Sequence, residues 1–205
     1  MLIRRSLVAA ILLGFMSISA CTTTSKGDPL PAESTGAPTS GSGEDLPFGG
    51  APKVNDPLDT SRYEKDPCQS LTADQTQSLN LPATGKIEDN VLLAVGCEWK
   101  NLTTRGYAQI EFVVEDPRGL SPDYRNRNKF AYFEVLPDIQ GYPAIARDAV
   151  DDRDNGYCIV LVGVADDMKF ASNVQLSQAN IEQKDPCEMA TKVAGMALQT
   201  MKQGA

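Results

Sequence analysis

The sequence predicts an α+β domain in which an antiparallel sheet of about five to seven strands is packed by a C-terminal helix. Residues 107–115 alternate apolar and polar side chains, a period of two that is typical of a strand with one buried face. Residues 157–165 are rich in Ile and Val and follow the hairpin signal Asp154-Asn155-Gly156, with a partner strand expected at 168–176. Residues 186–203 instead repeat their apolar side chains with the period of a helix.

The first helix of the domain is expected where two capping patterns follow each other. In Asp66-Pro67-Cys68-Gln69 the aspartate can cap the helix, the proline suits its first position and the glutamine lies three residues after the cap. Thr72-Ala73-Asp74-Gln75 forms a second capping box directly behind it. The helix should end near Asn80, because Pro82 blocks its continuation.

The middle of the chain predicts the remaining strands. Apolar runs indicate strands at residues 91–99, 130–136 and 144–149. Pro137 and the turn Gly141-Tyr142-Pro143 should separate the last two. Ser121-Pro122-Asp123 begins a short polar helix that should run to about Asn128.

The C-terminal helix carries the clearest pattern. Asp185-Pro186-Cys187-Glu188 repeats the cap, proline, cysteine and acid-or-amide order of residues 66–69. The apolar residues on one stripe of this helix are Ala190, Val193, Ala194, Ala197, Leu198 and Met201. Cys187 shares this inward face, and the small alanines predict a close approach to the sheet.

The N-terminus has the features of a lipoprotein signal peptide. Two arginines precede an apolar run from Leu7 to Ala20, which is shorter than the roughly 20 residues of a membrane-spanning helix. Ile18-Ser19-Ala20-Cys21 matches the bacterial lipobox, so cleavage would remove residues 1–20 and leave Cys21 as the lipidated N-terminus. The expected lipid is a diacylglycerol with palmitate as an acyl group, on the outer face of the cytoplasmic membrane. A secretory signal with an incidental cysteine is the alternative.

Residues 21–57 are expected to form a disordered tether between the lipid and the domain. Of the 36 residues from Thr22 to Pro57, 21 are Gly, Pro, Ser or Thr. Such a segment cannot bury enough apolar surface to offset the loss of backbone entropy. As a flexible coil it would span on the order of 30–35 Å. A single globular domain would then occupy residues 58–205.

Composition excludes several classes of function. The chain has no histidine and a net charge of −8. Histidine is the commonest general base and zinc ligand, so Ser-His-Asp and Cys-His catalysis within this chain are excluded. An acidic protein has no electrostatic reason to bind nucleic acid. Its attachment to an anionic membrane surface must therefore come from the lipid.

Neither a cofactor nor a metal site is expected. Asp151-Asp152-Arg153-Asp154-Asn155-Gly156 has the glycine of a calcium-binding EF-hand loop, but Arg153 occupies a ligand position. Val162 stands where the bidentate glutamate would be required, so the hairpin interpretation is preferred. Gly85-Lys86 lacks the other residues of a phosphate-binding loop and is interpreted as a turn.

Four cysteines remain once Cys21 carries the lipid, an even number suited to an oxidising compartment. We favour the pairs Cys68–Cys97 and Cys158–Cys187, because each joins a helix start to an expected strand. Each pair would close a loop of 29 residues and contribute about 3–4 kcal/mol in the chain-entropy model. The crossed pairing of Cys68 with Cys187 and of Cys97 with Cys158 stays open. The chain has no Cys-x-x-Cys motif, so these four cysteines are interpreted as structural.

These motifs together resemble an actinobacterial lipoprotein family catalogued as domain of unknown function 3558. The residues that carry the resemblance are the lipobox, Asp66-Pro67-Cys68 with Leu71-Thr72, Cys97-Glu98-Trp99, Gly141-Tyr142-Pro143-Ala144, Cys158, and Asp185-Pro186-Cys187 with Ala190 and Val193-Ala194. The resemblance covers residues 60–205. It implies an actinobacterial source and a cell-envelope location, and it implies no activity. By analogy, the fold could be related to the PsbP/Mog1-like α/β/α sandwiches.

The leading functional hypothesis is a non-enzymatic, lipid-anchored envelope protein that binds a partner protein or a small ligand. One alternative is a histidine-free hydrolase that uses the acidic pairs Glu115-Asp116 or Asp166-Asp167. Another is a carrier of lipid or a small ligand, which predicts a large apolar cavity. A solute-binding lipoprotein of a transporter ranks last, because about 145 residues leave no room for two lobes.

Two groups of side chains are weaker candidates for a binding surface. Trp99 and Tyr142 could line a ligand, although Trp99 is better explained by packing over a disulfide. Tyr124, Arg125, Arg127 and Lys129 form a basic-aromatic patch that could contact an anionic polymer of the cell wall. A solvated helix face is the preferred explanation of that patch.

Overall fold

A computed structural model describes residues 45–204 of the chain, except for residues 89–93. The expected signal peptide, Cys21 and the first part of the expected tether lie outside the described residues, as do residues 91–93 of one expected strand. The described helices are α1 (Ser61–Lys65), α2 (Ala73–Ser78), α3 (Ser121–Arg125) and α4 (Pro186–Gly204), with 3-10 helices η1 (Pro67–Ser70), η2 (Arg127–Lys129), η3 (Arg153–Asn155) and η4 (Gln178–Asn180). The described strands are β1 (Lys86–Glu88), β2 (Val95–Lys100), β3 (Tyr107–Phe112), β4 (Tyr132–Ile139), β5 (Tyr142–Asp148), β6 (Tyr157–Gly163) and β7 (Lys169–Gln175).

The strands described form one antiparallel, seven-stranded sheet in the order β1-β2-β3-β7-β6-β5-β4. This confirms the predicted α+β class and the antiparallel sheet. In β3, Ala108, Ile110 and Phe112 are buried while the residues between them are half-buried, as the period of two requires. The last strand, β7, lies in the middle of the sheet between β3 and β6. Strands β4, β5 and β6, which come earlier in the chain, form the side of the sheet beyond it.

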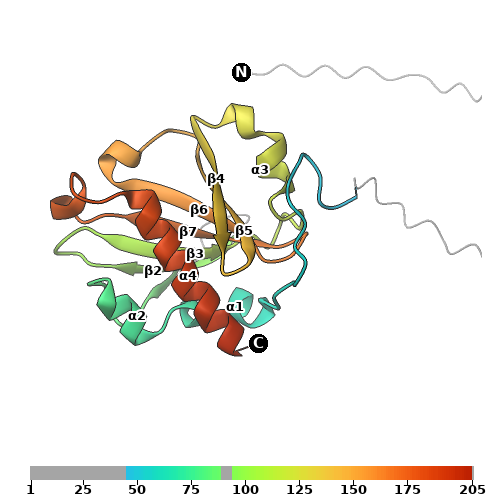
Figure 1. Ribbon diagram of the computed structural model, residues 1–205. Helices are drawn as coiled ribbons and strands as arrows, with labels where there is room; N and C mark the ends of the chain where they lie inside the picture. The colour runs from blue at the N-terminus through green and yellow to red at the C-terminus, as the bar shows by residue number, and fades with distance from the viewer. Residues whose placement is uncertain (1–44, 89–93, 205) are drawn as a thin grey trace, which may run out of the picture. The chain divides into compact units, whose positions relative to one another are not determined.

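Helix α4 lies across one face of the sheet and confirms the predicted helix (Figure 1). The whole predicted stripe is buried, comprising Ala190, Val193, Ala194, Ala197, Leu198 and Met201. The approach is close, because the Ser172 hydroxyl of β7 donates to the Ala190 carbonyl over 2.9 Å. Asp185 caps the helix, with Oδ1 accepting from the Cys187 and Glu188 amides at 2.7 and 3.2 Å.

The N-terminal helical region differs in part from the prediction. Helix α2 has the predicted capping box between Thr72 and Gln75. Residues 67–70, however, form only a 3-10 turn, and the Asp66 side chain makes no hydrogen bond to the backbone of that turn. Helix α1 was not predicted. Its tertiary anchor is the buried Tyr63, whose hydroxyl donates to the Thr200 carbonyl of α4 over 3.2 Å.

The β4–β5 hairpin also corrects a prediction. Its turn lies at Gln140-Gly141, with φ angles of 52° and 91°, so Tyr142 and Pro143 already belong to β5. Pro137 lies inside β4, because this is an edge strand with an irregularity between Leu136 and Ile139. An edge strand tolerates a residue without an amide hydrogen.

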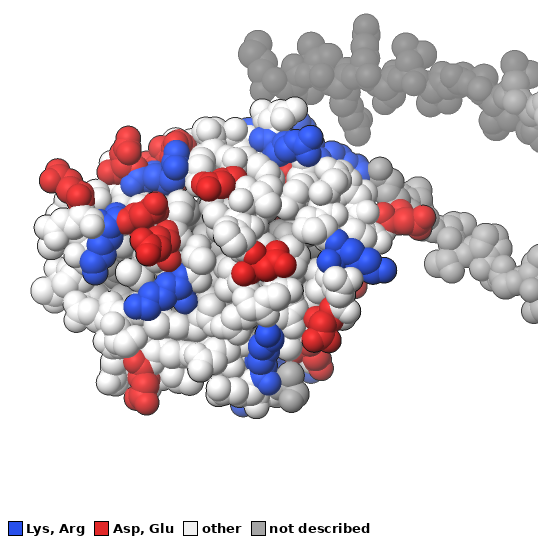
Figure 2. Space-filling model, viewed as in Figure 1, with Lys and Arg blue, Asp and Glu red and all other residues white. Residues whose placement is uncertain are grey.

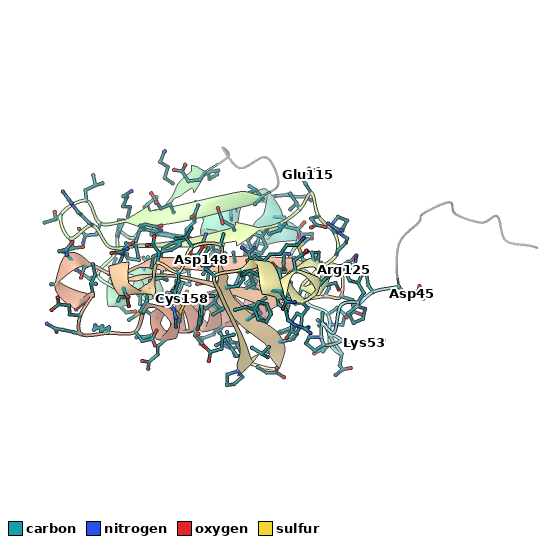
Figure 3. The ribbon with its side chains drawn as sticks, turned by 90° about the horizontal axis from the view of Figure 1, so that it is seen from above. Asp45, Lys53, Glu115, Arg125, Asp148 and Cys158 are labelled. Atoms are coloured by element: carbon teal, nitrogen blue, oxygen red, sulfur yellow. A yellow bond between two sulfur atoms is a disulfide. The ribbon has the colours of Figure 1, made fainter. Side chains whose placement is uncertain are left out.

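Residues 45–57, here called the strap, pack against the domain and correct the expected boundary at residue 58. Val54 is only 6% exposed, and its amide donates to Asp166 Oδ1 over 2.8 Å. The Phe48 amide donates to Ser121 Oγ over 3.1 Å, and the guanidinium carbon of Arg125 lies 3.8 Å from the centroid of the Phe48 ring. Figure 3 shows Asp45, Lys53 and Arg125 together at one end of the domain. These few contacts therefore hold the strap in place, although its composition predicts disorder.

Undocking the strap should expose the peptide bond after Lys53 to trypsin. Val54→Asp would bury an unpaired carboxylate, so we expect the strap to dissociate and cleavage after Lys53 to accelerate at least about tenfold. The matched control is Asn55→Asp, which adds the same charge at an exposed neighbour. Mass spectrometry of timed digests would give both rates. Equal rates in the wild type and the Val54→Asp variant would show that the strap is not docked in solution.

Candidate functional site

A cleft of about 220 Å³ lies between α2, α4 and the adjoining ends of β3 and β7. Its apolar lining includes Ala108 of β3, Val174 of β7, and Met189 and Val193 of α4. At about 30 Å³ for each water-sized group, it has room for roughly seven of them. This is below the 300–1,000 Å³ typical of sites for drug-sized ligands. The cleft suits a small molecule or one short apolar group.

Each polar side chain that lines the cleft is either positively charged or neutral. Lys184, just before α4, and Lys192, on α4, both line the cleft and are exposed. The remaining polar side chains are hydroxyl and amide groups such as Asn80 and Asn180, and the lining includes no carboxylate. Neither lysine forms an ion pair with a carboxylate in the described part of the chain.

The wall formed by α2 is fixed by polar contacts at both ends of the helix. Gln75 accepts from the Thr72 amide in the capping box and donates to the Met196 carbonyl of α4 over 3.0 Å. At the other end, the Asn101 side-chain amide donates to the Asn80 carbonyl over 2.9 Å. The cleft is therefore formed before any ligand arrives.

Two disulfides among the described residues attach helical segments to the sheet. Cys158–Cys187 joins β6 to the first turn of α4, and Cys68–Cys97 joins η1 to β2, each with a Cα–Cα distance of 5.1 Å. This confirms the favoured pairing and excludes the crossed one. The bond at Cys187 holds the wall formed by α4 only two residues before Met189, which lines the cleft.

The opposite face of the sheet carries a polar and aromatic cluster that the sequence analysis did not identify. The rings of Tyr107 and Tyr157 lie 6.4 Å apart, and burial raises the pKa of both phenols. Asn173, 5% exposed, donates to Glu111 Oε2 over 2.7 Å and to Gln109 Oε1 over 3.2 Å. Its own Oδ1 has no partner among the described residues. These side chains occupy the positions of β3, β6 and β7 that alternate with the core residues. The period of two in the sequence could therefore have identified them as neighbours on one face of the sheet.

In each of the two acidic pairs, one carboxylate is hydrogen-bonded within the domain and the other is exposed. Asp116 binds the guanidinium of Arg118, which lowers the pKa of the carboxyl, and Glu115 is exposed. Asp166 accepts the strap amide of Val54, and Asp167 is exposed. Both pairs follow the ends of β3 and β6, and none of their residues lines the cleft.

The loop from Asp151 to Gly156 is closed by its own arginine. Asp151 accepts two hydrogen bonds from Arg153, at 2.8 and 2.7 Å, and the Arg153 guanidinium lies 3.6 Å from the Tyr132 ring centroid. Gly156 is left-handed at φ 80° and precedes β6, as the hairpin signal predicts. Within residues 45–88 and 94–204, no group of three acidic or cysteine side chains is placed to hold a metal ion.

The aromatic candidates belong to the core. Trp99 is 1% exposed, and Tyr142 is also buried. A Cβ added at Gly85 would clash with Cys97 Sγ and with the Trp99 ring, so both side chains adjoin this glycine. The residues of the expected basic-aromatic patch do not share one exposed surface. Tyr124 is buried, Arg125 contacts the strap, and Arg127 is exposed.

Charge on the face that carries α4 is mixed, with acidic and basic side chains interspersed (Figure 2). This distribution offers no broad basic surface on that face for an anionic polymer. Of the helices described, none combines the length and the apolar character needed to span a bilayer.

Comparison with known proteins identifies one relationship. The model of a family described as Protein of unknown function (DUF3558) matches residues 17–200. No curated protein and no solved structure matched the chain, so the PsbP/Mog1-like analogy remains a prediction. The match spans nearly the whole chain, from residue 17 into α4, and the chain therefore belongs to the DUF3558 family.

Proposed function

We propose that this protein is a lipid-anchored binding protein of the cell envelope and that the cleft beside α4 is its ligand site. The observation that carries the proposal is a preformed cleft whose lining contains two lysines without carboxylate partners among residues 45–88 and 94–204. The disulfides indicate an extracytoplasmic protein, because such bonds persist in oxidising compartments. Lipid attachment at Cys21 is the remaining part of the proposal and rests on the lipobox.

Binding explains the cleft better than catalysis does. Its hydroxyl groups, including those of Ser78, Thr104 and Ser177, have no carboxylate beside them in the lining, and the chain has no histidine. A hydroxyl nucleophile needs an adjacent base to become reactive. The volume of about 220 Å³ also favours a small ligand over carriage of a whole lipid.

The strap would keep the cleft accessible while the domain is anchored. The strap contacts Asp166 just before β7, whereas the cleft lies at the other end of that strand, near Val174. Six steps of about 3.3 Å separate the two ends by roughly 20 Å. A tether that leaves the domain at Asp45 therefore begins away from the cleft.

Replacing Cys21 should release the protein from the membrane. In Cys21→Ala the thiol that would carry the diacylglycerol is absent, so we expect the protein to move from the membrane pellet to the soluble fraction. The control is Thr23→Ala, which should stay in the pellet. Non-reducing electrophoresis should show both disulfides intact in the released form. Retention of Cys21→Ala in the membrane would contradict lipid anchoring at this residue.

The binding site itself can be tested by nuclear magnetic resonance with a library of small molecules and the soluble domain. We expect amide shifts that cluster at Ala108, Val174 and Val193, because these residues form the apolar lining. Filling the cleft with Val193→Phe should abolish those shifts, while Val150→Phe at an exposed position should not. Shifts that cluster on another surface would overturn the assignment of the cleft.

A further inference from the structure

We propose that the cleft selects a small amphiphilic anion, with a carboxylate or similar head between Lys184 and Lys192 and a short apolar group against α4. This inference rests on the proposed function and adds the chemical class of the ligand. Its first basis is charge. The chain carries −8 overall, yet the lining of the cleft has two lysines and no carboxylate. Both ammonium groups lack an ion-pair partner among the described residues.

The second basis is the division of the cleft into a polar rim and an apolar interior. Ala108, Val174 and Val193 are buried, and Met189 is half-buried. The lysines that line the cleft are exposed, as is Asn80. A ligand with a charged head and an apolar tail could satisfy both parts at once. An inorganic anion would leave the apolar part unfilled, and a neutral hydrocarbon would leave the ammonium groups unpaired.

The third basis is size. About 220 Å³ accommodates roughly seven water-sized groups, which corresponds to a short alkyl chain rather than a diacyl lipid. Octanoate is therefore a suitable probe, with its carboxylate at the rim and part of its chain inside. Octyl glucoside carries the same chain with a neutral head and tests whether charge matters.

The experiment is a titration of the soluble domain with octanoate, followed by amide shifts and calorimetry. We expect shifts at Val193 and Ala108 and an affinity that falls as salt is added. The double variant Lys184→Gln/Lys192→Gln should weaken octanoate binding at least about tenfold, because it removes both favourable charge interactions. The matched control Lys53→Gln/Lys65→Gln has the same net charge but changes exposed lysines outside the cleft lining, and it should bind like the wild type.

A gain of binding would exclude a general loss of structure as the cause. Glu188 is exposed on α4, one turn before Lys192, and Glu188→Gln should strengthen octanoate binding by removing the nearby negative charge. If octyl glucoside shifts the same residues with equal affinity and the lysine variant is unaffected, the anionic class is wrong while the binding cleft stands. If neither probe shifts the cleft, this inference is wrong, and the library screen decides the proposed function separately.

Discussion

Replacing Asp123 by alanine is expected to lower the free energy of unfolding by about 3–5 kcal/mol, because it leaves a buried lysine without its counter-charge. Asp123 and Lys169 are each 4% exposed, and Lys169 Nζ donates to Asp123 Oδ2 over 2.6 Å. The other carboxylate oxygen accepts from Arg147 Nε over 2.9 Å. One carboxylate thus holds α3 to both β5 and β7.

The control for this prediction is another aspartate–arginine pair in a different environment. Asp151 and Arg153 bind each other at 2.7 Å, but both side chains are 40% exposed, so water screens the pair and Asp151→Ala should destabilise the protein far less than Asp123→Ala. Adding Lys169→Met to Asp123→Ala should recover part of the loss, because the unpaired charge is removed. Urea denaturation followed by circular dichroism would measure all three. Equal losses in Asp123→Ala and Asp151→Ala would contradict the importance of burial.

Elements governed by local patterns were predictable from the sequence. The stripe from Ala190 to Met201 and the Thr72–Gln75 capping box are encoded within a few residues, and both are present as predicted. The alternation of β3 likewise reports burial on one face. The sequence favours this cysteine pairing because each bond joins the start of a helical segment to a strand, and both bonds do so in the structure.

Features made by distant residues were not predictable. Asp123 lies in a segment whose composition predicts a polar, solvated helix, but its partners Arg147 and Lys169 are 24 and 46 positions away. The strap is ordered by a hydrogen bond between Val54 and Asp166, separated by 112 positions. No local period marks such a contact, so composition alone predicted a tether reaching residue 57.

The cleft has the same origin. Its residues come from the end of α2, the start of β3, the end of β7 and the first turns of α4. Each segment shows its own helix or strand pattern, and only the sheet order that places β3 beside β7 brings them together. Lys184 and Lys192 have no sequence feature that distinguishes them from other exposed lysines.

Removing the Cys158–Cys187 bond is expected to lower the free energy of unfolding by about 3–4 kcal/mol and to weaken binding at the cleft. The bond closes a loop of 29 residues, and the stability loss is a large share of the 5–15 kcal/mol typical of a domain. Cys187 lies in the first turn of α4, close to Met189 and Lys192 of the cleft lining. Without the bond, this turn should fray first and move Met189, and Lys184 just before the helix, away from the cleft.

The second disulfide is an internal control for that prediction, because Cys68–Cys97 also closes a loop of 29 residues. Chain entropy predicts an equal loss of stability for the Cys68→Ser/Cys97→Ser and Cys158→Ser/Cys187→Ser variants. Only the latter should also weaken octanoate binding under conditions where both variants are folded, since Cys187 lies on α4, which lines the cleft, whereas η1 and β2, which carry Cys68 and Cys97, do not line it. Denaturation midpoints and octanoate titrations of the two variants would separate the effects. Equal binding losses in the two variants would contradict a specific role of the α4 bond, and unchanged binding in both would mean that packing alone holds α4 at the cleft.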